Sequence, residues 1–367
     1  MKTYLCQVDR VDPARSPCLR EAASLLRSGG VVAFPTETVY GLGANAANDL
    51  AVERIFQAKG RPSDNPLIVH LSDASRISEW VDDAHPYVSR LAERFWPGPL
   101  TMVLPLKEGR ISNKVTAGLS TLGIRIPEHP VARELISLAG CPIAAPSANR
   151  SGRPSPTLAA HVQEDLEGLI DAIVDGGPAG VGLESTVIEL DEDRIHVLRP
   201  GGVNIEQLKD AIPEAYIISG TENISHTGEA PRAPGMKYTH YAPKGRMTVV
   251  LPKDLDKLDK ADQAASYGAV VSYIRSELQR ASEQGEKTGL LYFDEHTGDY
   301  HRCADVAISL GSLSMLETAA ARLYDALRTF DQQGVKVIYA EGCAQEGVGL
   351  ALMNRLQKAA GHQIVRR

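Results

Sequence analysis

The sequence lacks the short motifs that mark several common classes of nucleotide-binding and metal-binding proteins. No Gly-Lys-Ser or Gly-Lys-Thr occurs in its 367 residues, which excludes a P-loop nucleotide site. The five cysteines include no C-x-x-C pair. The sequence therefore supports neither a zinc site nor a disulfide framework, and we expect reduced thiols and no protein-held metal.

Long hydrophobic runs are also missing. No apolar run approaches the roughly 20 residues that a membrane-spanning helix needs. The first ten residues contain no apolar core of the kind that a secretory signal carries. We therefore expect a cytoplasmic protein without a membrane segment.

An excess of positive charge is missing too, because 39 Lys and Arg residues stand against 46 Asp and Glu residues, a net charge of −7. A protein that grips RNA through a broad basic face is expected to have the opposite balance. We therefore expect no strong direct binding of nucleic acid, although a local cationic pocket is compatible with this charge.

What is present over residues 1–212 is an alternation of helical patterns and short apolar strands. The predicted helices cover residues 17–27, 51–58, 88–95, 131–138 and 205–211. The predicted strands cover residues 31–34, 67–69, 100–104, 122–126, 142–145, 170–174 and 185–190. This pattern predicts an α/β domain with a twisted mixed sheet and helices, whose ligand loops lie at the strand ends.

The remaining third of the chain divides into two further parts. Residues 213–246 form either a passive linker or a lid, and the density of aromatic, cationic and His residues in the second half favours the lid. Residues 247–367 contain strand patterns at 247–251, 290–293 and 335–340, separated by helical patterns at 263–280, 316–330 and 350–359. They predict a smaller, Rossmann-like α/β domain with no cofactor fingerprint.

The stretch from Lys59 to Pro66 places two cations just past a predicted helix. Asp49 is expected to cap that helix and Gly60 to end it. The prolines stiffen the loop, and Lys59 and Arg61 offer a point charge and a planar fork to a polyanion such as a triphosphate. A solvated charged turn at a helix end is the alternative for this stretch.

Several other polar groups lie at predicted strand ends or within strands. The loop around Thr38 is either a capped turn or a ligand loop. Arg125 lies within an apolar strand, where a charge needs either an acidic neighbour or a ligand carboxylate. His70 is a structural histidine or a ligand contact, and the stretch from Ala145 to Asn149 is a Ser- and Pro-rich turn or a phosphate loop.

Taken in order, these motifs resemble those of the YrdC-type L-threonylcarbamoyladenylate synthases. The family signature of Lys-x-Arg followed much later by Ser-x-Asn is present as Lys59, Arg61, Ser147 and Asn149. The resemblance extends over essentially the whole chain and is to the long form with an extra C-terminal domain. It implies a YrdC-like catalytic domain over residues 1–212, a lid over the active site at 213–246 and a Rossmann-like domain over 247–367.

The resemblance also implies a reaction. L-threonine and bicarbonate or CO2 give an N-carboxy-threonine, whose carboxylate attacks the α-phosphorus of ATP, and pyrophosphate leaves. The product is L-threonylcarbamoyladenylate, which a downstream threonylcarbamoyl-transferase complex uses to modify tRNA. Mg2+ is expected to accompany the ATP phosphates with few protein ligands.

The resemblance assigns roles to individual residues. Lys59 and Arg61 are implied to be catalytic. The implied ATP contacts are Lys59, Arg61, Asn65, Thr121, Ser147, Asn149, Ser155, Arg199 and Tyr241. The implied L-threonine contacts are Thr38, His70, Arg125, Ala145 and Ser185. The family often has a hydroxyl residue at the position of Ala145, so that contact reduces to backbone groups here.

Two other functions are weighed against this one. An RNA-binding module would use the cationic concavity to hold tRNA without chemistry, and the net charge argues against it. A carbamoyl-transfer enzyme of metallocentre maturation would carry zinc-finger cysteine pairs beside its YrdC-like domain, and this sequence has none.

Overall fold

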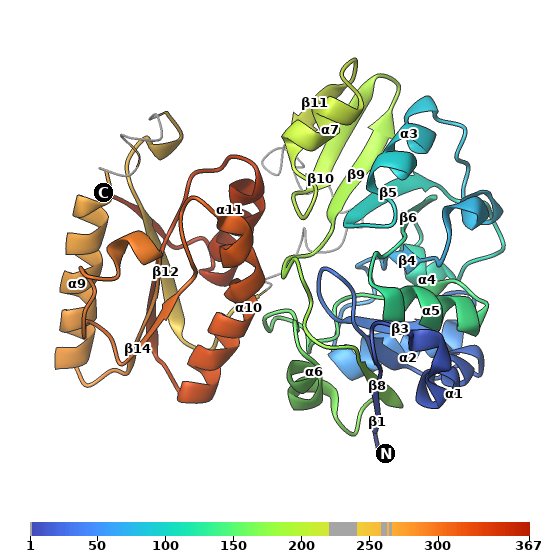
Figure 1. Cartoon of the computed structure of the whole chain (residues 1–367), viewed down its shortest axis with the longest axis horizontal. Helices are drawn as coiled ribbons and strands as arrows, with labels where there is room; N and C mark the ends of the chain where they lie inside the picture. The colour runs from blue at the N-terminus through green and yellow to red at the C-terminus, as the bar shows by residue number, and fades with distance from the viewer. Residues whose placement is uncertain (1, 220–240, 258–262, 264–265) are drawn as a thin grey trace. The chain divides into compact units, whose positions relative to one another are not determined.

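The computed structural model describes residues 2–219, 241–257, 263 and 266–367. These residues form two compact units, each of which is described separately below (Figure 1). Unit 1 contains the described residues of 1–151 and 155–238, and unit 2 contains those of 152–154 and 239–367. Residues 220–240, which are most of the predicted lid, lie outside the described part of the chain.

Unit 1 is built on one mixed sheet of eleven strands in the order β1-β8-β2-β3-β7-β4-β6-β5-β9-β10-β11. Parallel pairs such as β4 with β6 lie beside antiparallel pairs such as β5 with β6, as the sequence predicted. The strands are β1 (Tyr4–Gln7), β2 (Val32–Phe34), β3 (Gly41–Asn45), β4 (Val69–His70), β5 (Leu100–Pro105), β6 (Thr121–Arg125), β7 (Ile143–Ala144), β8 (Ala172–Asp175), β9 (Thr186–Asp191), β10 (Arg194–Arg199) and β11 (Tyr216–Ser219).

Amphipathic helices cover this sheet and complete the core of unit 1. Their buried faces contribute apolar side chains that pack against the strands in two clusters, one of which includes Leu91 and the other Leu135. The α-helices are α1 (Pro17–Arg27), α2 (Asp49–Lys59), α3 (Pro86–Phe95), α4 (Asn113–Thr116), α5 (Pro130–Ala139), α6 (Ala159–Leu166) and α7 (Ile205–Ala211). Short 3-10 turns are η1 (Pro13–Arg15) and η2 (Ala74–Glu79).

Helix α2 carries the cationic loop at its end, and its two caps fix where that loop begins. The N-cap is Asn48, whose side chain accepts hydrogen bonds from the backbone of Leu50 and Ala51. The predicted cap, Asp49, is wrong by one position and is the first helical residue. Gly60 ends the helix in the left-handed conformation with φ of 61°, as predicted.

Unit 2 contains a parallel sheet of five strands in the order β14-β13-β15-β12-β16. The strands are β12 (Arg246–Leu251), β13 (Thr288–Tyr292), β14 (Val306–Ser309), β15 (Val337–Glu341) and β16 (Ile364–Arg366). The helices are η3 (Leu255–Lys257), α9 (Gly268–Glu283), η4 (Asp294–His296), α10 (Leu316–Gln333) and α11 (Val348–Ala359).

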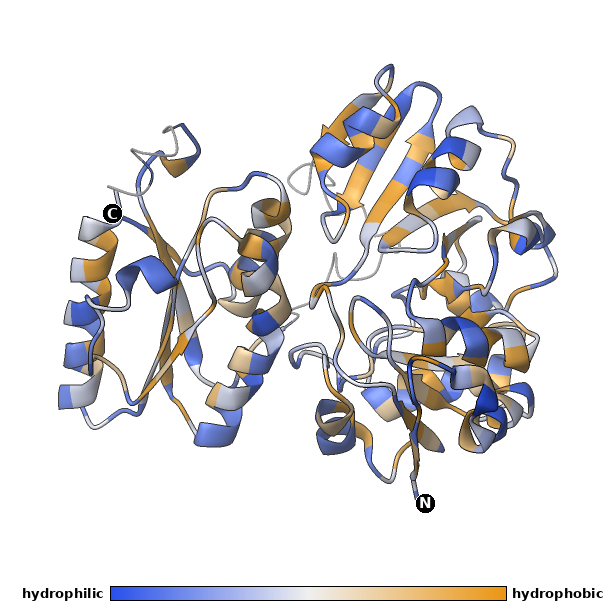
Figure 2. Ribbon diagram, viewed as in Figure 1, coloured by the Kyte–Doolittle hydropathy of each residue, from blue (hydrophilic) through white to orange (hydrophobic). Residues whose placement is uncertain are grey.

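The helices of unit 2 cover both faces of its sheet, with α9 on one face and α10 and α11 on the other (Figure 1). Figure 2 shows the hydrophobic residues of α9 on the side that faces the sheet, and these include the buried Ile274 and Leu278. This arrangement confirms the predicted smaller, Rossmann-like α/β fold.

A disulfide joins Cys6 of β1 to Cys18 of α1, and it contradicts the expectation of reduced thiols throughout. The two Cα atoms lie 5.6 Å apart, within the range that a disulfide spans. The pair escaped sequence reasoning because its separation of 12 residues matches no standard motif, and only the packing of β1 beside α1 brings the thiols together. Cys141, Cys303 and Cys343 are free, as expected.

In the part of the chain that the structure describes, no helix is both long enough and apolar enough to cross a membrane.

Candidate functional site

Lys59 ties the cationic loop to the Ser-x-Asn loop. Its side chain is 2% exposed, and its ammonium group donates to the backbone carbonyls of Ser147 and Asn149. The backbone carbonyl of Lys59 in turn accepts a hydrogen bond from Ser151. The two halves of the signature, almost ninety residues apart in sequence, are therefore in direct contact.

The rest of the cationic loop folds back around Arg61. Its guanidinium donates to the carbonyls of Asn65 and Pro66 at 3.4 and 3.2 Å. The Asn65 side chain is 1% exposed, and its amide oxygen has no hydrogen-bond partner among the described residues. A buried acceptor without a partner is costly, and such an atom is suited to a ligand donor.

The Ser-x-Asn loop presents its polar groups beside Lys59. The hydroxyl of Ser147 bonds to the side-chain oxygen of Asn149, and the Asn149 amide nitrogen donates to the carbonyl of Arg150. The chain at Ser147 also makes an antiparallel bridge with Gly41 at the start of β3. This bridge places the Ser-x-Asn loop next to the loop that carries Thr38.

Arg125, at the end of β6, is the centre of a second group. It is buried, and its guanidinium donates to the Glu37 carboxylate at 2.5 Å, to the Thr38 hydroxyl at 2.9 Å and to the Gly98 carbonyl at 3.2 Å. The structure thus gives this strand arginine an acidic neighbour. A guanidinium has five N–H groups, so one on each terminal nitrogen has no bond among the described residues.

His70 lies beside Arg125, because β4 and β6 pair at these two residues. Its side chain is 4% exposed, and its Nδ1 has no hydrogen-bond partner among the described residues. Burial, with the Arg125 charge as the next cause, lowers the pKa of His70 to about 3. The imidazole is therefore neutral at physiological pH and offers a hydrogen bond without a charge.

A third group connects β5, β9 and β10. The Ser185 and Thr101 hydroxyls lie 2.8 Å apart. Arg199 at the end of β10 donates to the Ser185 carbonyl at 2.9 Å and to its hydroxyl at 3.1 Å. Because β5 pairs with both β6 and β9, this group belongs to the same region of the sheet as Arg125.

Two predicted residues use their polar groups for bonds within the protein. Ser155 is fully buried and donates to Glu184 at 2.6 Å. Ala145 is buried, and its backbone N–H is bonded to the Ile68 carbonyl. A direct ligand contact for either residue stays a prediction.

Tyr241 belongs to unit 2, where it is buried with a backbone φ of 67°. Its ring lies 5.2 Å from that of Tyr324, and the Arg355 guanidinium lies 5.7 Å from its centroid. These contacts hold the ring within unit 2, so its predicted ATP contact also stays a prediction.

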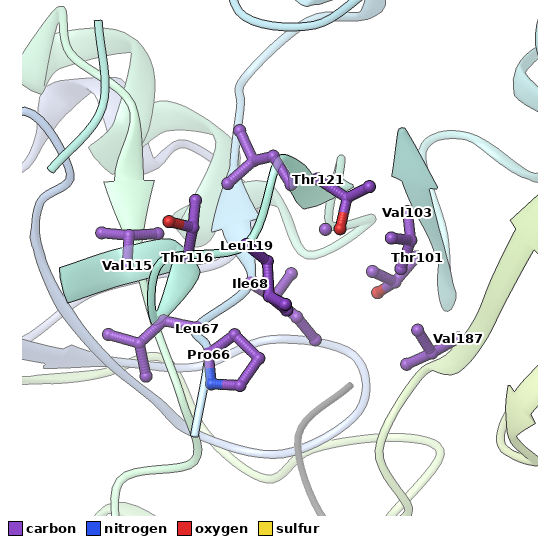
Figure 3. Close-up of a pocket in the computed structure, with 12 residues that line it drawn as sticks. Pro66, Leu67, Ile68, Thr101, Val103, Val115, Thr116, Leu119, Thr121 and Val187 are labelled. Atoms are coloured by element: carbon purple, nitrogen blue, oxygen red, sulfur yellow. The ribbon is translucent and has the colours of Figure 1, made fainter. Parts of the chain in front are cut away.

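Thr121 lines a shallow pocket on the sheet of unit 1 (Figure 3). The floor is apolar, with Ile68, Val103 and Val187, and Figure 3 shows the hydroxyls of Thr101 and Thr121 among these side chains. The enclosed volume is only about 10 Å3, which is too small to hold a ring, and the apolar side chains of the floor are buried.

Sequence reasoning did not assign roles to Thr36, Glu37 and Thr101, which the structure places in direct contact with predicted site residues. A signal for the first two was present, because the loop at 36–38 combines two hydroxyls and a carboxylate after a buried strand. No comparable signal marks Thr101, which lies within an apolar strand and meets Ser185 only through strand pairing.

Comparison with known proteins matches both parts of the chain. A family model named Sua5_yciO_yrdC and described as "Telomere recombination" matches residues 24–201. A second model, described as "Threonylcarbamoyl-AMP synthase, C-terminal domain", matches residues 203–361. The two matches together cover most of the sequence.

Individual relatives match along the whole length. The threonylcarbamoyl-AMP synthase of Bacillus subtilis is 47% identical over 100% of both chains, and that of Pyrococcus abyssi is 45% identical over 95% of each. The crystal structure of P. abyssi Sua5 complexed with L-threonine is 43% identical, with a TM-score of 0.87 over 100% of both chains. Because these relatives are named as synthases and match this chain along its full length, the comparison favours an enzyme over an RNA-binding module. The chain belongs to the threonylcarbamoyl-AMP synthase family, in the form that joins a YrdC-type region to a Sua5 C-terminal domain.

Proposed function

We propose that unit 1 forms L-threonylcarbamoyladenylate and pyrophosphate from L-threonine, bicarbonate or CO2, and ATP, as the name of its family indicates. The observation that carries this proposal is the contact between Lys59 and the Ser147 and Asn149 carbonyls, which joins the two signature loops at one place. The reaction brings a carbamate to a triphosphate, and both are anions. Cations fixed in a buried region offset this repulsion more strongly than cations in water.

The nucleotide phosphates are assigned to the loop of Lys59 and Arg61. Arg61 is partly exposed and supplies the planar fork that suits phosphate oxygens. Lys59 contributes its charge and holds the Ser-x-Asn loop in place. The buried amide oxygen of Asn65 suits a donor such as a ribose hydroxyl.

The adenine base is assigned to the shallow pocket of Figure 3. A nucleobase is flat and largely apolar, and the partly exposed Leu119 and Thr121 in the lining offer a surface for it. The hydroxyl of Thr121 at its edge offers a hydrogen bond to the base or the ribose.

L-threonine is assigned to the group around Arg125. Arg125 has one N–H group on each terminal nitrogen that is not bonded within the described residues. These two N–H groups suit the two oxygens of the amino-acid carboxylate. The neutral His70, with Nδ1 unbonded, suits the threonine hydroxyl. A buried polar atom that only a hydroxyl satisfies rejects valine, which has the same shape but no hydroxyl.

Mg2+ is proposed to enter with ATP as part of the substrate. The described residues contain no group of three or more His, Cys, Asp and Glu side chains that could hold a metal ion. The groups at the phosphate loop are cations, carbonyls and amides, which suit a metal held mainly by phosphate and water oxygens. When bound, Mg2+ neutralises phosphate charge that Lys59 and Arg61 alone do not.

We propose a cytoplasmic location and a downstream partner for this enzyme. The product serves threonylcarbamoyl modification of tRNA, so a transferase complex that accepts the adenylate must act next. We propose no strong direct contact with tRNA, because the chain carries a net charge of −7.

The test is to incubate the purified protein with Mg-ATP, L-threonine and bicarbonate and to measure pyrophosphate. Release should require all three substrates, and valine should replace threonine poorly. Release without threonine, or none with the complete mixture, would contradict the proposal. A tRNA titration tests the RNA-binding alternative, which requires tight binding with a steep salt dependence.

A further inference from the structure

We infer that Thr36 and Glu37 are positioning residues: Thr36 turns the Thr38 hydroxyl into a pure acceptor for the amino group of L-threonine, and Glu37 aligns Arg125 for its carboxylate. This inference deepens the proposed function and rests on it. Both residues are buried in the loop between β2 and β3, and neither is assigned a substrate contact.

The direction of the hydroxyl chain follows from its acceptors. The Thr36 hydroxyl lies 2.6 Å from the Val39 carbonyl, which accepts but never donates, so the Thr36 proton is used there. The Thr36 and Thr38 hydroxyl oxygens lie 2.8 Å apart. The Thr36 oxygen also accepts from the backbone N–H groups of Thr38 and Val39, at 3.2 and 3.3 Å. Because Thr36 has no second proton, Thr38 must donate in the bond between the two hydroxyls.

The hydrogen-bonding groups that Thr38 still has available determine which kind of ligand group its hydroxyl can bind. Its proton points to Thr36, and one lone pair accepts from Arg125 at 2.9 Å. One lone pair remains. A group bound at this hydroxyl must therefore be a donor, and the amino group of an amino acid is a donor beside the carboxylate that Arg125 takes.

Glu37 fixes the other half of the site. One carboxylate oxygen accepts from Arg125 at 2.5 Å, and the other accepts from the Glu128 backbone at 3.1 Å. The Glu37 carbonyl accepts from Val181 at 2.7 Å, which anchors the loop itself. With both oxygens bonded, the carboxylate holds one edge of the guanidinium and leaves one N–H on each terminal nitrogen for the substrate.

The spacing between the two sites suits one small molecule. Thr38 and Arg125 are bonded to each other, so the acceptor oxygen of Thr38 lies next to the guanidinium that supplies the remaining N–H groups. An α-amino acid carries its ammonium and carboxylate on the same carbon. The arrangement therefore favours α-amino acids whatever their side chain. The carbamate formed from threonine retains one N–H, which can still donate to the Thr38 hydroxyl.

The test uses calorimetry of L-threonine binding together with steady-state kinetics. Thr36→Val keeps the shape of the side chain but removes its hydroxyl, which bonds to the Val39 carbonyl, to the Thr38 hydroxyl and to two backbone N–H groups of the loop. We expect the Kd for L-threonine to rise at least about tenfold, the equivalent of one lost hydrogen bond to the substrate. The KM for ATP should stay within about threefold. Thr36→Ser, which restores the hydroxyl, should restore the Kd, and Glu37→Gln should weaken threonine binding by a similar factor.

A matched control is Thr288→Val in unit 2, which likewise removes a buried threonine hydroxyl, in this case one that donates to the Asp305 carboxylate. It should leave threonine binding unchanged. The deaminated analogue 3-hydroxybutyrate lacks the N–H donor, so the preference of the protein for threonine over it should shrink about tenfold in Thr36→Val.

Three results would overturn the inference. The first is a Kd for L-threonine in Thr36→Val equal to that of the wild type. The second is an equal rise of this Kd in Thr36→Val and Thr36→Ser, and the third is a rise of the KM for ATP by the same factor as the Kd for L-threonine. Failure of the proposed function is separate, because wild-type protein would then release no pyrophosphate while the calorimetry would still report on Thr36 and Glu37.

Discussion

Replacing His70 by Asn tests whether the threonine site contains a neutral imidazole. His70 is 4% exposed on β4, next to Arg125, and burial with this neighbouring charge lowers its pKa to about 3. Asn keeps a polar group near the position of Nδ1 and does not titrate. The difference in stability between wild type and His70→Asn therefore reports on the proton that His70 binds in the unfolded chain but not in the folded protein.

The sign and size of the effect follow from proton linkage. In the unfolded chain His70 titrates near 6.5, so below that pH the unfolded state binds a proton that the folded state does not. The contribution of the neutral His70 to the free energy of unfolding is present above pH 6.5 and is lost as the pH falls toward 3. Between pH 7.5 and pH 5 the free energy of unfolding should fall by about 2 kcal/mol because of His70, and this part should vanish in His70→Asn.

The assay is urea unfolding followed by tryptophan fluorescence without ligands. Both tryptophans, Trp80 and Trp96, lie in unit 1, so the signal reports on the unit that contains His70. His301→Asn, at an exposed position in unit 2, is the control. If the stability difference between wild type and His70→Asn is the same at pH 7.5 and pH 5, the imidazole is not held neutral by its surroundings and the reasoning is wrong.

Three further predictions concern other parts of the molecule. Lys59→Met and Arg61→Ala should each abolish pyrophosphate release. Lys59→Met should also lower stability by about 2 kcal/mol, measured by urea unfolding, because it leaves buried carbonyls without a donor. Reduction of the Cys6–Cys18 disulfide should destabilise unit 1 by about 3 kcal/mol for a loop of this length, and Cys18→Ser should abolish that effect of the reductant in the same unfolding assay. Chelation of Mg2+ should stop pyrophosphate release while L-threonine binding, measured by calorimetry, persists.

The elements that were predicted well have strong local signals. Helix α1 begins behind Ser16 with a proline in its first turn, and α7 has the predicted bounds of residues 205–211. Such capping and periodicity depend on a few neighbouring residues. The off-by-one N-cap of α2 shows the limit, because Asn48 and Asp49 are both good caps and only the backbone geometry decides between them.

The elements that were missed depend on distant contacts. Strand β3 is rich in glycine, which disfavours strands locally, yet a Cβ at Gly43 would lie 2.7 Å from Phe34 and 2.8 Å from Ile143. Glycine is required there because neighbouring side chains cross close to the backbone. A pattern read along one segment contains no information about such a partner, and the disulfide at Cys18 was missed for the same reason.

Arg125 shows why the site was predicted in outline but not in detail. The sequence posed two alternatives, an acidic neighbour or a ligand carboxylate, and the neighbour, Glu37, lies 88 residues away along the chain. The structure makes the alternatives compatible, because Glu37, Thr38 and Gly98 use three of the five N–H groups. A buried guanidinium without an anion would be costly before the substrate arrives, and the ion pair removes that cost while leaving two donors in fixed directions. Since Glu37 already neutralises the charge, selection of the carboxylate must come mainly from the geometry of those two donors.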